Sequence, residues 1–314
     1  MKKGGYINTI EKALMHGLFV HLHHNIDKVI DFKGFQVPGM KGYVVAKMDS
    51  HCSPCVPRPY DAAATGAGGA MRDVVAMGGR PVFLLDFIGT RPLEQEVIVG
   101  PCGFSGHCTC GKCKVMTSGE RVNIMVKGLR DMCEAMDVFI VGGGFSTSFS
   151  DIVPAVVVSV FGKLVTERPL TKRAKKAGDK IIIIGVTGND GNDTLYRAGL
   201  VKEMRPAIAL FKEERTALEA AMAAFGSGKI KACSDLGAAG IGAAICESAR
   251  YMVHVAPESA DEVLRAVRSK TDNAVVIGEV TSDEKEVFEY NGEVVAVIPN
   301  KPSKETLEAL RSGK

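Results

Sequence analysis

The chain has 314 residues, of which 46% are hydrophobic and 24% charged, a composition typical of a globular protein and not of a disordered one. Its formal net charge of +3 is too small to favour nucleic acid or an anionic membrane surface as a partner. No apolar run approaches the roughly 18 residues of a membrane span, and the N-terminus has no apolar signal segment, so a cytoplasmic location is expected.

Cysteine is frequent for a protein expected in the cytoplasm. The chain has nine cysteines, an odd number, and five of them lie in two short segments, Cys52–Cys55 and Cys108–Cys113. Such tight spacing suits metal binding or thiol chemistry better than a framework of disulfides. A disulfide framework is therefore the weaker interpretation.

The first half of the chain predicts alternating strands and helices. Residues 1–35 look helical and rich in histidine, and Thr65–Gly79 reads as a small-residue loop that leads into a helix. Residues 89–118 contain glycine, proline and cysteine without a clean period, which is typical of a loop or a small insertion. The remaining expected elements are a helix at Gly119–Met136 and strands at Tyr43–Asp49, Pro81–Ile88, Val138–Val141 and Val153–Gly162.

A linker at Leu164–Gly178 leads to a second half that also mixes strands and helices. The dipeptide Asn291–Gly292 predicts a tight hairpin turn. The expected elements are strands at Lys180–Val186, Tyr251–Ala256, Ala274–Val280 and Glu293–Ile298 and helices at Pro206–Phe225, Asp235–Arg250 and Ser259–Ser269. The chain is therefore expected to have an α/β or α+β fold in two domains, residues 1–165 and 166–314.

The segment Lys47–Asp73 carries the densest set of reactive side chains. An expected strand delivers Lys47, Asp49 and His51, and the Gly/Ala-rich loop then enters a helix that bears Asp73. Glycines let a backbone approach a phosphate closely, and a helix N-terminus offers free N–H donors. Carboxylates beside such a loop suit Mg²⁺, which prefers oxygen ligands and bridges to phosphates. On the residues alone, tight packing of a helix on a strand explains the glycines about as well.

Two further segments place an acidic residue next to glycines close to an expected strand. Cys233–Gly240 contains Asp235, and Gly185–Asp193 contains Asp190. Ordinary turns have the same composition. The order and combination of the segments, and not each one alone, therefore indicate a function.

In this combination the segments resemble the family of formylglycinamidine ribonucleotide synthase and aminoimidazole ribonucleotide synthetase, whose relatives include selenophosphate synthetase and thiamine-phosphate kinase. The family reads K-x-E-S-H-N-H-P-S, then G-A-A-T-G-V-G-G-x-x-R-D-V and A-R-P, where this chain has KMDSHCSPC, AAATGAGGAMRDVVAMG and GRP. GVTGNDGND and SDLGAAG resemble the family's G-G-R-T-G-R-D-G and Q-D-x-G-A-A-G-L. The resemblance covers nearly all of the chain except residues 1–40 and 89–118, and it is closest to the N-terminal half of the amidotransferase.

The resemblance implies a PurM-like architecture of paired A and B domains, in which the A domains of two subunits meet in a barrel-like dimer core. It implies an enzyme that uses ATP and Mg²⁺ to phosphorylate an amide or carboxylate oxygen. A nitrogen or sulfur nucleophile then attacks the activated carbon, and phosphate leaves. Because this chain has a single A–B unit, a homodimer is expected, with a separate subunit that supplies ammonia or sulfur.

The resemblance also assigns roles to individual residues by their place in the motifs. Asp49, Asp73 and Asp235 match the family's metal-binding acids, with Asp49 in place of a glutamate. Lys47 and His51 match the catalytic region, where a lysine stabilises phosphoryl charge and a histidine positions groups or transfers a proton. The residues expected to contact ATP are Thr65, Gly66, Gly68, Gly69 and Asp190.

The sequence departs from the family at three motif positions. Ser53 replaces the second histidine of the first motif, Cys55 replaces its last serine, and Gly144 replaces the glutamate of a G-G-E motif. These positions lie on the acceptor side, so ATP use is better supported than the purine substrate. Two alternatives stay open: a small-molecule kinase or phosphate donor like selenophosphate synthetase, and a non-catalytic subunit that binds nucleotide or metal.

The cysteine-rich insertion predicts a second kind of site. Zinc or an iron–sulfur cluster is the favoured occupant of its four cysteines, Cys102, Cys108, Cys110 and Cys113. Cys52 and Cys55 could join them or carry sulfur as a persulfide. Inert thiols in a loosely packed insertion are the remaining alternative.

Overall fold

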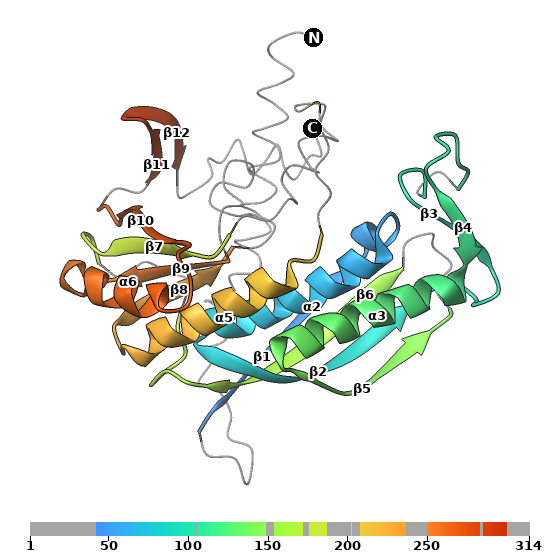
Figure 1. Cartoon of the computed structure of the whole chain (residues 1–314), viewed down its shortest axis with the longest axis horizontal. Coiled ribbons are helices and arrows are strands. Elements are labelled where there is room, and N and C mark those ends of the chain that lie inside the picture. The colour runs from blue at the N-terminus through green and yellow to red at the C-terminus, as the bar shows by residue number, and fades with distance from the viewer. Residues whose placement is uncertain are drawn as a thin grey trace.

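The protein is described here by a computed structural model. It describes residues 42–103, 106–148, 154–171, 176–186, 202, 208–236, 250–282 and 285–299. Within these residues the chain forms a mixed α/β architecture with two four-stranded sheets, as the sequence predicts (Figure 1). Asp190 and the histidine-rich segment before residue 42 lie outside the described residues.

The first sheet carries the N-terminal motifs. Its strands are β1 (Val44–His51), β2 (Gly79–Gly89), β5 (Phe139–Ser146) and β6 (Ala155–Leu164). The strand order is β1-β6-β2-β5, with β6 antiparallel to both of its neighbours and β5 parallel to β2. The glycine triplet at 142–144 lies inside β5 and pairs with β2, whereas the sequence placed it after the strand.

Two helices, α2 (Pro59–Ala76) and α3 (Ser118–Met136), lie side by side on one face of this sheet (Figure 1). They cross closely at Gly128, where a Cβ atom would lie 2.2 Å from the carbonyl oxygen of Tyr60. The start of α3 is fixed by a capping box, in which Thr117 and Glu120 each accept a hydrogen bond from the other's backbone N–H.

The expectation of a glycine-rich loop at Thr65–Gly69 is wrong, because these residues lie in the interior of α2. The helix begins earlier, at Pro59, which has the fixed φ of a first helical residue and needs no N–H partner. Alanines on both sides of the glycines favour continuation of the helix. The backbone N–H groups of Thr65–Gly69 are therefore not those of a free helix N-terminus.

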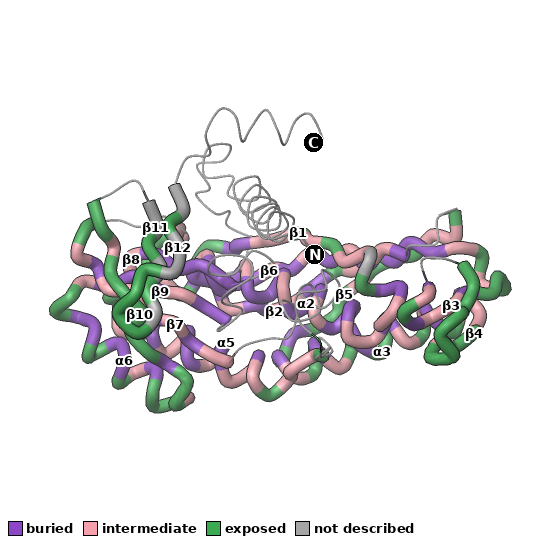
Figure 2. Tube along the Cα trace, turned by 90° about the horizontal axis from the view of Figure 1, so that it is seen from above, coloured by how far each residue is buried: buried purple, intermediate pink, exposed green. Residues whose placement is uncertain are grey.

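Residues 89–118 contain a small hairpin at one end of the molecule (Figure 1). Strands β3 (Glu96–Val99) and β4 (Lys114–Thr117) pair antiparallel, with Val99 opposite Lys114. The cysteines of the insertion lie in the loop between these two strands. Figure 2 shows that this loop and β4 are largely exposed.

The second sheet has the order β10-β7-β9-β8, all antiparallel, and lies at the opposite end of the molecule from the β3–β4 hairpin (Figure 1). Its strands are β7 (Lys180–Ile184), β8 (Ile230–Asp235), β9 (Tyr251–Val255) and β10 (Ala274–Glu279). The helices that follow β7 and β9 in the chain are α5 (Phe211–Gly226) and α6 (Ala260–Arg268), and two short 3-10 turns are η1 (Ser53–Cys55) and η2 (Pro257–Ser259). A separate hairpin is made of β11 (Lys285–Tyr290) and β12 (Glu293–Pro299), joined at Asn291–Gly292 as expected.

Helix α5 connects the two sheets, because it contacts α2 and α3 as well as α6 and β7. At this junction the buried carboxylate of Glu214 forms ion pairs with Arg72 on α2 and with Arg250, and its Oε1 lies 3.3 Å from the Arg250 Nε. The purple segments of Figure 2 show that the core runs continuously through this junction.

None of the helices that the structure describes combines the length and the apolar character needed to cross a bilayer.

Candidate active site

Strand β1 presents the motif side chains to helix α2. The Lys47 Nζ lies 3.0 Å from Asp73 Oδ2 on α2. Side chains on a strand alternate between faces, so Asp49 and His51 point to the same side as Lys47. The intervening Met48 is 66% exposed on the opposite face. The structure therefore brings Lys47, Asp49, His51 and Asp73 into the space between β1 and α2.

His51 is held in one orientation by α2. Its Nδ1 lies 2.8 Å from the carbonyl oxygen of Ala62. Because a carbonyl oxygen only accepts hydrogen bonds, Nδ1 carries a proton, and Nε2 is the ring nitrogen that this hydrogen bond does not use. A Cβ atom at Gly66 would lie 3.2 Å from the imidazole Cγ, so the absence of a side chain at Gly66 makes room for the ring.

The other residues expected to contact ATP are placed along the same helix. The Thr65 Oγ1 donates a hydrogen bond of 2.8 Å to the Asp61 carbonyl oxygen, within the helix itself. A Cβ at Gly68 would meet the tip of Met132 on α3, and one at Gly69 would meet only the end of Arg72, 3.7 Å away. The glycines thus allow α2 to pack on His51 and α3, and their contact with a phosphate stays a prediction.

Asp235 lies at the end of β8, which packs against α2. It is buried and pairs across the sheet with Tyr251. Burial raises the pKa of Tyr251 well above its usual value, and the negative charges of Glu214 and Asp235 add to the rise. Asp235 is therefore a buried acidic residue next to α2, in a different sheet from Asp49.

Asp86 on β2 is an acidic residue of this region that the sequence reasoning missed. In the register of the first sheet, Asp49 and Asp86 both pair with Val158, so they face the same side two strands apart, roughly 10 Å. A Cβ at Gly143 would lie 2.3 Å from Asp86 Oδ1, so this glycine provides the space for the carboxylate. Burial raises the pKa of Asp86 above its ordinary value.

The four cysteines of the hairpin loop converge. The Sγ atoms of Cys102, Cys108, Cys110 and Cys113 all lie within 4.8 Å of one another. Cys52 and Cys55 do not belong to this group among the described residues. Cys55 is buried beside β1, where its Sγ lies 3.6 Å from the His51 carbonyl oxygen. Burial and the neighbouring Cys52 raise the pKa of Cys55 to about 12, which disfavours a reactive thiolate.

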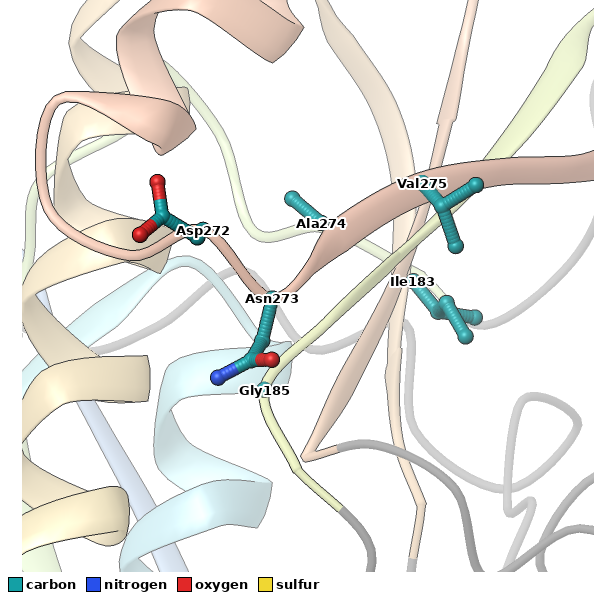
Figure 3. A pocket seen from close by; sticks show the side chains of 6 residues that line it. All are labelled: Ile183, Gly185, Asp272, Asn273, Ala274 and Val275. Atoms are coloured by element: carbon teal, nitrogen blue, oxygen red, sulfur yellow. The ribbon is translucent and has the colours of Figure 1, made fainter.

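A cavity of about 270 Å³ lies at the second sheet, and neither Lys47 nor Asp73 is among the residues that line it (Figure 3). Its lining comes from the end of β7 and from the turn before β10. Asn273 is held at its mouth, where its carbonyl oxygen accepts a hydrogen bond of 2.8 Å from the N–H of Gly185. Gly185 opens the segment Gly185–Asp193, which is described only as far as Val186.

Comparison with known proteins agrees with the motifs. Residues 29–164 match the family of the AIR synthase related protein, N-terminal domain. The chain is 30% identical over 305 residues to phosphoribosylformylglycinamidine synthase subunit PurL of Methanosarcina mazei, covering 82% of this chain and 39% of that protein. The PurL subunit of Methanocaldococcus jannaschii is also 30% identical, over 293 residues, with 80% and 38% coverage. The chain spans about two-fifths of the length of these relatives.

Solved structures share the fold. T. maritima PurL complexed with ATP matches with a TM-score of 0.62 and 21% identity, over 85% of this chain and 46% of that chain. The hydrogenase maturation protein HypE matches with a TM-score of 0.58 and 14% identity, over 90% of this chain and 96% of that chain. The resemblance predicted from the motifs is thereby confirmed. Residues 29–164 are similar to the N-terminal domain of the AIR synthase related family, and the chain shares the fold of the solved PurL structure.

Proposed function

We propose that this chain is a subunit of an ATP- and Mg²⁺-dependent ligase that resembles phosphoribosylformylglycinamidine synthase. The observation that carries the proposal is the pairing of Lys47 with Asp73 next to Asp49 and His51, inside the matched family domain. The similarity to PurL subunits, one of which was solved in complex with ATP, supports the nucleotide.

The chemistry of the three aspartates suits a magnesium ion, although their carboxylates are not gathered into one group among the described residues. Asp49, Asp73 and Asp235 offer hard carboxylate oxygens, the ligands that Mg²⁺ prefers, and no sulfur or imidazole is needed among them. Asp73 already faces a cation, the Lys47 ammonium, which shows that this position accommodates positive charge. In this proposal the three aspartates hold Mg²⁺, which when bound neutralises the phosphate charge of ATP.

Lys47 and His51 have separate roles in the proposed reaction. Lys47 supplies a positive charge from β1 to the phosphoryl group as it moves. His51 keeps its Nε2 free of the Ala62 hydrogen bond, so it accepts a proton from the attacking nucleophile. The γ-phosphoryl group passes to an amide or carboxylate oxygen of the acceptor and ADP leaves. A nitrogen nucleophile then attacks the acceptor carbon, and phosphate leaves.

A second candidate is an ATP-using enzyme of the same fold that acts on a different acceptor. The changes at Ser53 and Gly144 lie on the acceptor side of the motifs and agree with a changed acceptor. A kinase-like phosphate donor is the form of this candidate in which no new C–N bond is made.

We infer that two copies of the chain pair through the face of the first sheet that carries no helix. Met48, Leu85, Phe87 and Phe139 are exposed on that face. Phe83 and Phe161 stack beside them with ring centroids 4.9 Å apart. A contiguous apolar surface of this kind is normally an interaction site. The partner that supplies ammonia or sulfur, the boundary near residue 165 and the cytoplasmic location remain predictions.

The test is ATP hydrolysis with Mg²⁺ in matched variants. Asp73→Asn and Asp235→Asn remove one candidate ligand charge each, and we expect both to lose at least about tenfold in rate. Asp137→Asn is the control, because Asp137 is exposed at the C-terminus of α3 with φ of 57°, a conformation that asparagine also adopts. Equal rates in all three variants would remove the assignment. Product analysis separates the candidates: a new C–N bond with free phosphate supports the ligase, whereas a stable phosphorylated product supports the kinase.

A further inference from the structure

The loop between β3 and β4 holds a group of sulfur atoms that the proposed ATP site does not use. The Cys102–Cys110, Cys110–Cys113 and Cys108–Cys110 Sγ separations are 3.2, 3.8 and 3.9 Å. Four sulfurs bound to one tetrahedral zinc ion at about 2.3 Å each lie about 3.8 Å apart. The spacing in the hairpin loop is therefore that of four thiolates around a single ion.

We propose that Cys102, Cys108, Cys110 and Cys113 bind one Zn²⁺ ion, which fixes the hairpin loop against the segment behind His51. A [4Fe–4S] cluster places each thiolate on a different iron and spreads the sulfurs farther apart than they are here. A disulfide joins only two sulfurs, and none of these four cysteines is disulfide-bonded. Inert thiols are usually buried, whereas Cys108 and Cys110 are exposed.

The backbone around the cysteines is shaped to bring the sulfurs together. Gly100 has φ of 137°, and a Cβ atom there would lie 2.9 Å from the Cys113 Sγ. Only glycine therefore lets the chain leave β3 so close to this sulfur. Gly111, with φ of 68°, turns the chain between Cys110 and Cys113.

Two backbone N–H groups lie close to the sulfurs, and two lysines neighbour the last cysteine in the sequence. The N–H of Cys102 lies 3.3 Å from the Cys113 Sγ, and the N–H of Lys112 lies 3.4 Å from the Cys110 Sγ. Hydrogen bonds of this kind orient metal-bound thiolates and stabilise their charge. Four thiolates and one Zn²⁺ leave a net charge of about −2, and the lysines on either side of Cys113, Lys112 and Lys114, are of the opposite sign.

The hairpin loop contacts the segment that follows His51. A Cβ atom at Gly103, next to Cys102, would lie 2.5 Å from the Val56 Cγ1, so the two segments touch. Val56 is fully buried and follows Cys55, whose Sγ contacts the His51 carbonyl oxygen. A metal that orders the hairpin loop therefore also supports the segment that leads out of the candidate active site.

Metal analysis of the purified full-length chain tests the site. We expect close to one zinc per chain after dialysis against magnesium-free buffer, and tetrahedral thiolate bands when Co²⁺ replaces it. Cys108→Ser and Cys110→Ser should each lose most of the zinc and the bands. Because both cysteines are exposed, these variants leave no cavity in the core. Cys52→Ser is the matched control and should keep the metal.

Three results would overturn the zinc site. The first is wild-type protein that holds no zinc and gives no cobalt bands after reconstitution. The second is iron with acid-labile sulfide in the purified chain. The third is zinc content in Cys108→Ser equal to that of Cys52→Ser.

Hydrogen exchange tests the link to His51. The N–H groups of Cys55 and Arg58 donate to the carbonyl oxygens of Cys52 and Pro54, at 3.0 and 3.1 Å. Zinc removal by a chelator should raise exchange in this segment about tenfold or more, and leave the β9 amides unchanged. Unchanged exchange near Cys55 in zinc-free protein would show that the ion does not support this segment.

Discussion

His51 is positioned by one hydrogen bond and by the absence of a methyl group at Gly66. Gly66→Ala places a Cβ atom 3.2 Å from the imidazole Cγ, so the ring must shift by a few tenths of an ångström. A shift of this size moves Nε2 relative to a bound substrate. We expect ATP-dependent turnover to fall by about tenfold or more with little change in nucleotide affinity. Steady-state kinetics would show this as a loss in kcat.

Gly69→Ala provides the comparison on the same helix. An added Cβ meets only the end of Arg72, at an ordinary contact distance of 3.7 Å. The substitution should raise the free energy of unfolding by about 0.5–1 kcal/mol, because alanine favours a helix interior over glycine. A loss of activity in this more stable variant would place Gly69 in contact with the nucleotide. Wild-type turnover in Gly66→Ala would contradict the role given to His51.

The contributions of Asp86 and Asp131 to the stability of the fold should change with pH in opposite directions. Burial raises the pKa of Asp86, so its ionisation destabilises the folded chain as pH rises above the unfolded value of about 4. Asp86→Asn should therefore be more stable than wild type at pH 7, and the difference should disappear toward pH 4. Hydrogen bonds from Lys127 and Tyr60 lower the pKa of Asp131 to about 2.

The sign for Asp131 follows from the same linkage. The charged Asp131 side chain stabilises the folded chain at pH values above the pKa that this residue has in the unfolded chain. This stabilisation is lost as the pH falls toward about 2, the pKa of Asp131 in the folded chain. Asp131→Asn should therefore be less stable than wild type at pH 7, with a gap that narrows in acid. Urea unfolding of both variants between pH 4 and 7 measures the two trends. Two differences of the same sign at pH 7 would contradict the placement of these carboxylates.

The sequence identified Lys47, Asp49, His51 and Asp73 because they lie in one uninterrupted motif. The Lys47–Asp73 ion pair agrees with that grouping. Asp86 was not predicted because it is an isolated acidic residue in an apolar strand. Only the pairing of β1 and β2 with β6 places it in line with Asp49. Strand register joins residues distant in sequence, and no local pattern contains that information.

At the scale of elements, α2 and α5 are joined by buried charge. Glu214 pairs with Arg72 and Arg250, and all three side chains are buried. Glu214→Gln removes the negative charge that Glu214 supplies to these two buried arginines. We expect the free energy of unfolding to fall by about 3–5 kcal/mol, because uncompensated buried charge is costly. Chemical denaturation measures this loss.

Glu219 on the same helix is the matched control. It pairs with Arg80 at 2.8 Å and with Arg215 at 3.1 Å, but these side chains are 31–37% exposed. Glu219→Gln should cost only about 0–1 kcal/mol, since water already screens the charges. Equal losses in Glu214→Gln and Glu219→Gln would show that the buried cluster does not fasten α5 to α2.

Helices and strands with a clear hydrophobic periodicity could be predicted from the sequence. The secondary structure of glycine-rich segments could not. The helix expected at Gly119–Met136 agrees with α3 to within one residue. Thr65–Gly69 was expected as a loop because glycine is a poor helix former. Its place in α2 depends on packing against His51 and α3, which is a tertiary effect. Strand β8 was missed for a related reason: its short sequence IKACSD has little period, and its pairing with β9 stabilises it.

At the scale of the whole molecule, the first sheet has helices on one face and exposed apolar side chains on the other. Phe139 on β5 is 67% exposed there. Phe139→Glu puts a charge into the proposed contact between copies, and burial of an unpaired charge is costly. We expect the variant to be monomeric where wild type is dimeric, as measured by light scattering after size-exclusion chromatography.

Val126→Glu is the control for added charge. Val126 is an exposed residue on α3, away from the helix-free face of the sheet. This variant should keep the wild-type mass. A monomeric wild-type protein would rule out pairing through the sheet, as would a dimeric Phe139→Glu variant with unchanged affinity.

In the proposed function, acidic residues from β1, α2 and β8 hold a metal-bridged triphosphate. Calorimetric titration of Mg·ATP into the full-length chain tests it most directly, with Asp73→Asn and Asp137→Asn alongside. We predict that wild type and Asp137→Asn bind equally, and that Asp73→Asn binds at least about tenfold more weakly. Undiminished binding by Asp73→Asn, or no binding by the wild type, would contradict the account.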